Sequence, residues 1–94
     1  MSTVLVRLTV EDPEKWKAGF TQAGTLRKSY GSKGARAYSN ADNPKEFLVV
    51  AEYEDAARAR EMFQSQEFRD ATKRAGVVGA PQVVFMDEAL QLPA

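Results

Sequence analysis

The segment from Phe47 to Tyr53 restricts the possible folds of this chain more than any other part of the sequence. Its alternation predicts a β-strand. One face of this strand carries Phe47, Val49, Ala51 and Tyr53, and the other carries Leu48, Val50 and Glu52. Both faces are therefore largely apolar. Because a sheet that is covered on one side only shows a polar outer face, this strand is expected to lie in a sheet with something packed on each side.

The rest of the chain shows a periodicity that predicts three further strands and two helical regions. Strands are expected at 4–10, 34–40, 47–53 and 83–86, a helix over 13–30, and a second helical region over 56–75 that is interrupted at Ser65-Gln66. Asp12 before Pro13 is a helix start, Gly76 is the expected C-terminal cap, and Gly79-Ala80-Pro81 is interpreted as a break before the last strand. This order is that of the α+β class, in a ferredoxin-like βαββαβ fold with a four-stranded antiparallel sheet. One domain is expected over 3–89, followed by a C-terminal tail over 90–94.

Composition excludes several kinds of function. The chain has 94 residues, with 13 Lys plus Arg against 13 Asp plus Glu, and it contains neither His nor Cys. Disulfides, thiolate nucleophiles and histidine bases are therefore absent, and no metal site or cofactor is expected. A net charge of zero and the lack of an apolar run of about 20 residues argue against nucleic acid and membrane partners and favour a cytoplasmic protein.

Six aromatic side chains are candidates for a substrate-binding pocket suited to a flat ligand. They are Trp16, Phe20 and Tyr30 on the sheet-facing side of the first helix, together with Tyr53, Phe63 and Phe68. The alternative is a filled core, because an aromatic stripe at helical spacing usually serves packing. Trp16 is the first residue to test, since it lies near the helix start, where a pocket mouth is plausible.

Polar candidates lie on the second and third strands. Arg36 and Tyr38 share one face, with Asn40 two residues further on. They are the catalytic candidates, because an arginine stabilises a developing oxyanion and a tyrosine donates a proton to it. The alternative is a polar seam at a dimer interface, where both residue types are enriched. Glu52 is either a base or an interface acceptor paired with Arg7 or Arg36.

Several short motifs, in this order and spacing, resemble a known superfamily. They are the strand Val4 to Val10, the helix start at 12–17 (DPEKWK), Arg36 with 40–44 (NADNP) in the hairpin, and 76–81 (GVVGAP) before the last strand. Together they look like the dimeric α+β barrel superfamily, and within it the small proteins grouped with antibiotic biosynthesis monooxygenases and often labelled cyclase-like. The resemblance covers residues 4–88.

The resemblance implies a homodimer in which two four-stranded sheets meet face to face and the helices cover the outside. It also implies a ligand pocket in each subunit, between sheet and helices, where aromatic polyketide intermediates are oxidised or cyclised without metal or flavin. Oxygenases of the family tend to carry an asparagine and a tryptophan four residues apart on the third strand, where this chain has Val49 and Tyr53. Related proteins often place a histidine late in the first strand, where this chain has Leu8.

Three functional hypotheses follow. The resemblance favours a cofactor-independent monooxygenase or cyclase that acts on an aromatic or polyketide-like small molecule, with Arg36 and Tyr38 as polar groups if their face reaches the pocket. Residue chemistry favours a non-catalytic homodimer that binds a small hydrophobic ligand, or an accessory dimer whose interior is filled by side chains.

Overall fold

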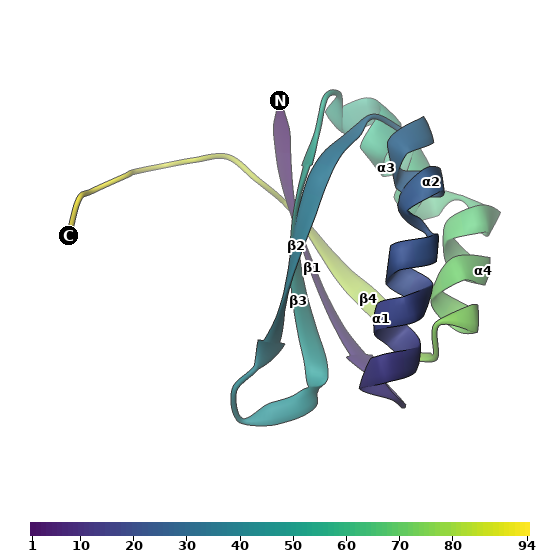
Figure 1. Ribbon diagram of the computed structural model, residues 1–94. Coiled ribbons are helices and arrows are strands. Elements are labelled where there is room, and N and C mark those ends of the chain that lie inside the picture. Colours follow the sequence, from purple (N-terminus) through teal and green to yellow (C-terminus); the bar gives the residue numbers. More distant parts are fainter.

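The computed structural model describes residues 1–94 as one four-stranded antiparallel sheet with all helices on one of its faces (Figure 1). In chain order the elements are β1 (Ser2–Val10), α1 (Pro13–Gln22), α2 (Gly24–Ser29), β2 (Ser32–Asn40), β3 (Asn43–Tyr53), α3 (Ala56–Gln64), α4 (Gln66–Arg74) and β4 (Val77–Met86). The strand order in the sheet is β2-β3-β1-β4, so β2 and β4 are the edges. The predicted ferredoxin-like βαββαβ fold is confirmed.

The core lies between the sheet and the helices, and the period of two in the central strands produces it. Alternate residues of β1 and β3 point to the helices and are buried; they are Val4, Val6, Leu8, Val10, Phe47, Val49, Ala51 and Tyr53. From the helices, Trp16, Ala59 and Met62 complete this layer. Burial of this apolar surface is the main favourable contribution to folding.

Local capping fixes where the helices begin and end. The Asp12 carboxylate accepts hydrogen bonds from the backbone N–H groups of Glu14 and Lys15, and Pro13 follows as the first helical residue. The predicted C-terminal cap at Gly76 is present, with φ of 79°. The expected single helix over 13–30 is wrong, because the chain is divided at Ala23 (φ −74°, ψ 0°) into α1 and α2.

The strands are longer than the sequence indicated, most of all β4. This strand begins at Val77, which pairs with Val10, and not at Val83. The interpretation of Gly79-Ala80-Pro81 as a break is wrong: Gly79 has a positive φ of 72°, and the pairing register with β1 shifts between Arg7 and Thr9, but the strand continues. The irregularity is a bulge within an edge strand.

Two surfaces of the sheet carry no helix. On the face opposite the helices, Tyr38 and Val84 are exposed, while Leu5, Leu48 and Val50 are partly exposed. On the helix side, the edge strand β2 extends beyond the helical layer, and its small residues Ala35 and Ala37 are exposed. No helix of the structure has the length and apolarity that crossing a bilayer requires. Residues 87–94 form neither helix nor strand and extend away from the sheet (Figure 1).

Candidate functional site

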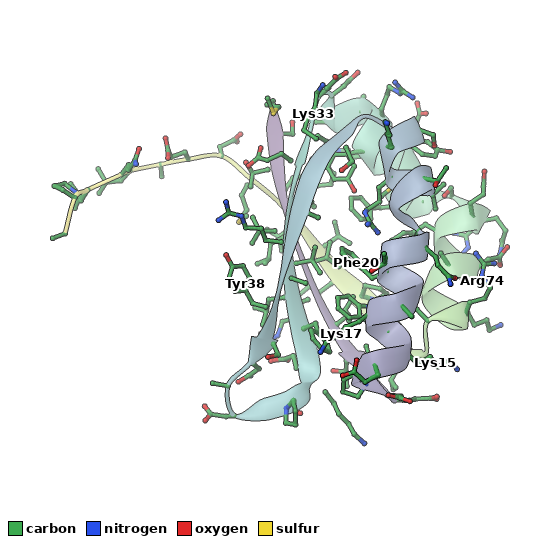
Figure 2. All side chains as sticks on the ribbon, in the orientation of Figure 1. Lys15, Lys17, Phe20, Lys33, Tyr38 and Arg74 are labelled. Atoms are coloured by element: carbon green, nitrogen blue, oxygen red, sulfur yellow. The ribbon has the colours of Figure 1, made fainter.

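A small apolar cavity lies between the sheet and the helices. Its volume is about 60 Å³, and 15 of its 18 lining residues are hydrophobic. Five of the predicted pocket residues are among them: Trp16, Phe20, Tyr53, Phe63 and Phe68. Figure 2 shows Phe20 on the side of α1 that faces the sheet. Tyr30, the sixth, does not line the cavity and packs instead at the edge of the core, at the end of α2.

One wall of the site is a series of stacked planar groups. The indole of Trp16 stacks on Phe47 with ring centroids 4.3 Å apart and on Phe20 at 4.9 Å. The guanidinium carbon of Arg27 lies 3.9 Å from the centre of the Phe20 ring. Such stacking holds each group in one orientation.

The opposite wall is built from edge-to-face contacts around Phe63. Its ring contacts Phe68 with centroids 5.0 Å apart, Tyr53 at 6.0 Å and Phe85 at 6.1 Å, with interplanar angles between 69° and 88°. Aromatic rings favour this geometry because the positive edge of one meets the negative face of another. The cavity is therefore bounded on two sides by rings with fixed positions.

Polar groups at the cavity are few, and Arg27 is the only charged one. Its Nη1 donates a hydrogen bond to the backbone oxygen of Phe20 at 2.7 Å. Burial lowers the pKa of Arg27, since a low-dielectric surrounding disfavours the charged form. An arginine nevertheless stays protonated in proteins, so the cavity has one permanent positive charge at its edge.

Tyr53 supplies the buried hydroxyl of the cavity. Its ring is 1% exposed, and its Oη lies 4.0 Å from the sulfur of Met62. Burial raises the pKa of Tyr53, while the nearby positive charge of Arg27 lowers it to a smaller extent. The phenol is therefore neutral at pH 7 and can donate a proton or a hydrogen bond. No Asp or Glu lines the cavity.

The structure does not bring Arg36 and Tyr38 to this cavity. In the β2–β3 register Arg36 lies opposite Val50 and Tyr38 opposite Leu48, and these β3 residues point away from the helices. Figure 2 shows Tyr38 on the far side of the sheet from α1. The face of the strand decides this placement, because side chains two residues apart share a face and cannot reach through the sheet.

Glu52 also lies on the open face, but its partner differs from the expected one. Its carboxylate accepts a hydrogen bond from the Thr3 hydroxyl at 2.9 Å, and Arg7 pairs with Glu46 at 2.9 Å. The expected pairing of Glu52 with Arg7 or Arg36 is not formed within the subunit. The reason is register: Thr3 is directly opposite Glu52 on β1, whereas Arg7 is opposite Leu48.

Arg27 was not among the residues predicted to line the pocket, although the sequence contains a signal for it. Trp16, Phe20 and Ala23 recur at spacings of four and three, and the next step of this stripe falls on residue 27. A single charged residue on an otherwise apolar helix face is an unusual observation. Arg27 lies where the core borders the hollow beside the edge strand β2.

Comparisons with known proteins agree with this architecture. No family model matches the sequence, and no curated protein is similar to it. The fold of the chain is similar, over nearly its whole length, to that of solved structures named as antibiotic biosynthesis monooxygenases, which is the fold that the sequence resemblance implied.

Two solved structures illustrate the match. A protein from Bordetella bronchiseptica, named as a candidate antibiotic biosynthesis monooxygenase, has a TM-score of 0.80 at 20% identity, covering 95% of this chain and 97% of its own. SnoaB, a cofactor-independent oxygenase from Streptomyces nogalater, has a TM-score of 0.77 at 15% identity, covering 99% of this chain and 97% of its own. At these identities the likeness establishes the fold.

Proposed function

We propose that this protein binds a small aromatic or polyketide-like molecule between its sheet and helices and acts on it as a cofactor-independent monooxygenase or cyclase. The observation that carries the proposal is the cavity itself, which has flat aromatic walls and a single cation, Arg27, at its edge. This combination suits a planar ligand with an oxygen that becomes negative during reaction. The fold shared with SnoaB, an oxygenase that needs no cofactor, supports the same chemistry.

In such a reaction the carbanion form of a phenol or enol anion either adds to dioxygen, giving a hydroperoxide that loses water to leave a carbonyl group, or adds to a carbonyl carbon of the same molecule, after which the new hydroxyl leaves as water. The protein then contributes orientation, exclusion of water and stabilisation of the anion. Arg27 would stabilise the oxyanion, and the neutral Tyr53 would donate a hydrogen bond to it. Because no carboxylate lines the cavity, the acidic proton of the substrate would leave to solvent.

The polar groups of this site differ from those of the resembling oxygenases. Val49 and Tyr53 stand where those enzymes tend to carry asparagine and tryptophan, and Leu8 stands where related proteins often have histidine. All three residues line the cavity. We therefore assign the polar role to Tyr53 together with Arg27, which reaches the cavity from α2.

The open face of the sheet supports the proposed homodimer. Its centre is apolar, with Leu5, Leu48 and Val50, while hydrogen-bonded polar pairs lie toward the ends of the strands. An apolar centre with a polar rim is the usual composition of a protein interface. A second copy of the sheet would cover the face opposite the helices, as the apolar residues on both faces of β3 indicate. Arg36 and Tyr38 would then lie at the margin of the interface.

The alternative is a non-catalytic ligand-binding or accessory homodimer, and the size of the cavity favours it. An engineered cavity of about 150 Å³ binds benzene. The volume here is about 60 Å³, so even one aromatic ring requires the surrounding elements to move. A cavity that stays closed would be a packing feature of an accessory dimer.

A ligand screen separates these functions. Ligands that bind only the folded state raise the melting temperature, so thermal shift against phenols and polyketide-like aromatics should identify binders. Ala71→Val, which fills the cavity, should remove the shift, whereas Ala57→Val on the exposed surface of α3 should retain it. The absence of a shift with every compound would favour the accessory dimer.

A turnover assay then tests catalysis. Each binder is incubated with a chelator present and no flavin added, while dioxygen uptake and product mass are followed. Gain of an oxygen atom identifies a monooxygenase, and loss of water without oxygen uptake identifies a cyclase. Binding without conversion would contradict the catalytic proposal and support the non-catalytic alternative.

Sedimentation equilibrium tests the homodimer. The wild-type protein should sediment as a dimer, and Val50→Asp should shift it to monomer, because the substitution would place a buried carboxylate in the apolar centre. Ala57→Asp adds the same charge on the helical side and should leave the dimer intact. A monomeric wild-type protein would refute the assembly.

A further inference from the structure

We propose that a hollow between α1, α2 and the edge strand β2 binds the acidic oxygen of the ligand, so that the ligand class is an aromatic anion, a phenolate or a carboxylate. The inference rests on the proposed binding of an aromatic molecule in the cavity and adds that this molecule carries a negative charge. Hereafter this hollow is called the entrance. It is lined by Phe20, Gly24, Arg27, Lys28, Ser32, Gly34 and Ala35.

The entrance adjoins the inner cavity. Phe20 and Arg27 line both, so the two spaces share one wall. The entrance has a volume of about 280 Å³. Once the surrounding elements move to admit an aromatic ring to the inner cavity, the outer substituent of the ligand would lie beside Arg27.

Small residues keep the entrance open. On the β2 side the lining consists of Ser32, Gly34 and Ala35, and a Cβ at Gly34 would have no heavy atom within 4 Å. On the α2 side the lining consists of Gly24, Arg27 and Lys28, and none of these residues is buried. The hollow thus offers space beside the Arg27 guanidinium without displacement of a buried core residue.

The charge at the entrance is positive and unpaired. Arg27 and Lys28 line it, and no Asp or Glu does. Every ion pair of the structure involves other residues, namely Arg7 with Glu46, Lys17 with Glu14 and Lys33 with Glu54. An arriving anion would therefore meet two cations that no carboxylate of the protein neutralises.

Arg27 is held in position to receive that anion. Its Nη1 donates to the Phe20 oxygen, and its guanidinium lies over the Phe20 ring, which together fix the plane of the group. The other N–H groups form no hydrogen bond within the protein and remain free to donate. A planar fork of donors matches a carboxylate or a phenolate oxygen better than it matches a neutral group.

Burial adds to this preference. Removal of water from the guanidinium lowers the pKa of Arg27, and an anion bound against it would offset that loss of hydration. A neutral ligand would remove the remaining water without any such compensation. The same position therefore favours a charged ligand over an uncharged one of equal shape.

Calorimetric titration with matched ligands tests the inference. The probes are 2-naphthoate, which is an anion at pH 7, and 2-naphthamide, which has the same rings and no charge. A charged hydrogen bond contributes about 1.5–3 kcal/mol, so naphthoate should bind roughly 10- to 100-fold more tightly. Arg27→Met should abolish this difference, and Lys28→Met should reduce it less.

Arg69→Met provides the control, since Arg69 is exposed on α4 and lines neither space. It should keep the full preference for naphthoate. Equal affinity of the two probes, or a preference that survives Arg27→Met, would overturn the anion inference while aromatic binding in the cavity stands. If neither naphthoate nor naphthamide binds, both the anion inference and the proposed aromatic binding are overturned.

Discussion

The contact between α1 and the end of α4 gives the most direct test of how the cavity is built. Gly19 in α1 faces Ala75, and both residues line the cavity. A Cβ added to Gly19 would stand 2.8 Å from the Cβ of Ala75 and 3.2 Å from its Cα. Ala75 is 5% exposed and belongs to the core, so the two helices would have to separate.

The magnitude of the effect of Gly19→Ala follows from two opposing contributions. Overpacking of a core contact costs about 1–3 kcal/mol. Alanine in place of glycine stabilises a helix by up to about 1 kcal/mol. The free energy of unfolding should therefore fall by up to about 2 kcal/mol, which for a domain of this size corresponds to a decrease in Tm of up to about 16 °C.

Urea unfolding, followed by circular dichroism at one fixed protein concentration, measures this difference. Gly24→Ala is the matched control, because its Cβ would meet only the Nη2 atom of Arg27, at an ordinary distance of 3.5 Å. Its stability should be unchanged or slightly raised. The double variant Gly19→Ala with Ala75→Gly removes the clash and should recover about 1–2 kcal/mol as a coupling energy.

Two results would refute this reasoning. If Gly19→Ala were more stable than the wild-type protein, as helix propensity alone would make it, the close approach of the helices would not limit their packing. If the double variant showed no coupling, the loss of stability would come from a contact other than that with Ala75.

Further predictions concern the core, the sheet and the first helix. Trp16 is 3% exposed. Its replacement by alanine should lower the free energy of unfolding, measured in urea, by about 3–5 kcal/mol, and its replacement by phenylalanine should lower it clearly less. Hydrogen bonds from Asn40 and then Arg7 lower the pKa of Glu46, so its stabilising effect is present above the ordinary glutamate pKa of about 4.3 and is lost as the pH falls through the lowered value. Glu46→Gln should therefore be less stable than wild type at pH 7, with a difference that closes in acid; a difference independent of pH would contradict this. Asp12→Ala should lose about 1 kcal/mol of stability and Asp12→Asn only a few tenths, which thermal melts would resolve.

Local patterns predicted the elements of the fold because each signal lies within a few residues. The alternation in β3, the Asp12-Pro13 helix start and the Gly76 cap all depend on neighbours in the chain, and the structure contains each of them. The Ser65-Gln66 interruption is also present, since the Ser65 hydroxyl accepts a hydrogen bond from the Phe68 N–H and begins α4.

Features that depend on distant partners were not predictable in the same way. The start of β4 at Val77 follows from its pairing with Val10, which no local pattern reveals. The partner of Glu52 depends on the β1–β3 register. The sequence shows that Arg36 and Tyr38 share one face of their strand, but not which face of the sheet this is. The β2–β3 register shows that it is the face without helices.

The irregular edges of the sheet have a consequence for how copies of this protein meet. In β4 the glycine at 79 twists the strand, and Pro81 offers no N–H to a neighbouring chain. At the other edge, β2 carries Lys33 and the positive-φ Gly34, where the register with β3 shifts. Side-by-side growth into a continuous ribbon is thereby discouraged at both margins. Self-association through the broad surface of the sheet, as in the proposed homodimer, would end with two partners instead of propagating into a fibre.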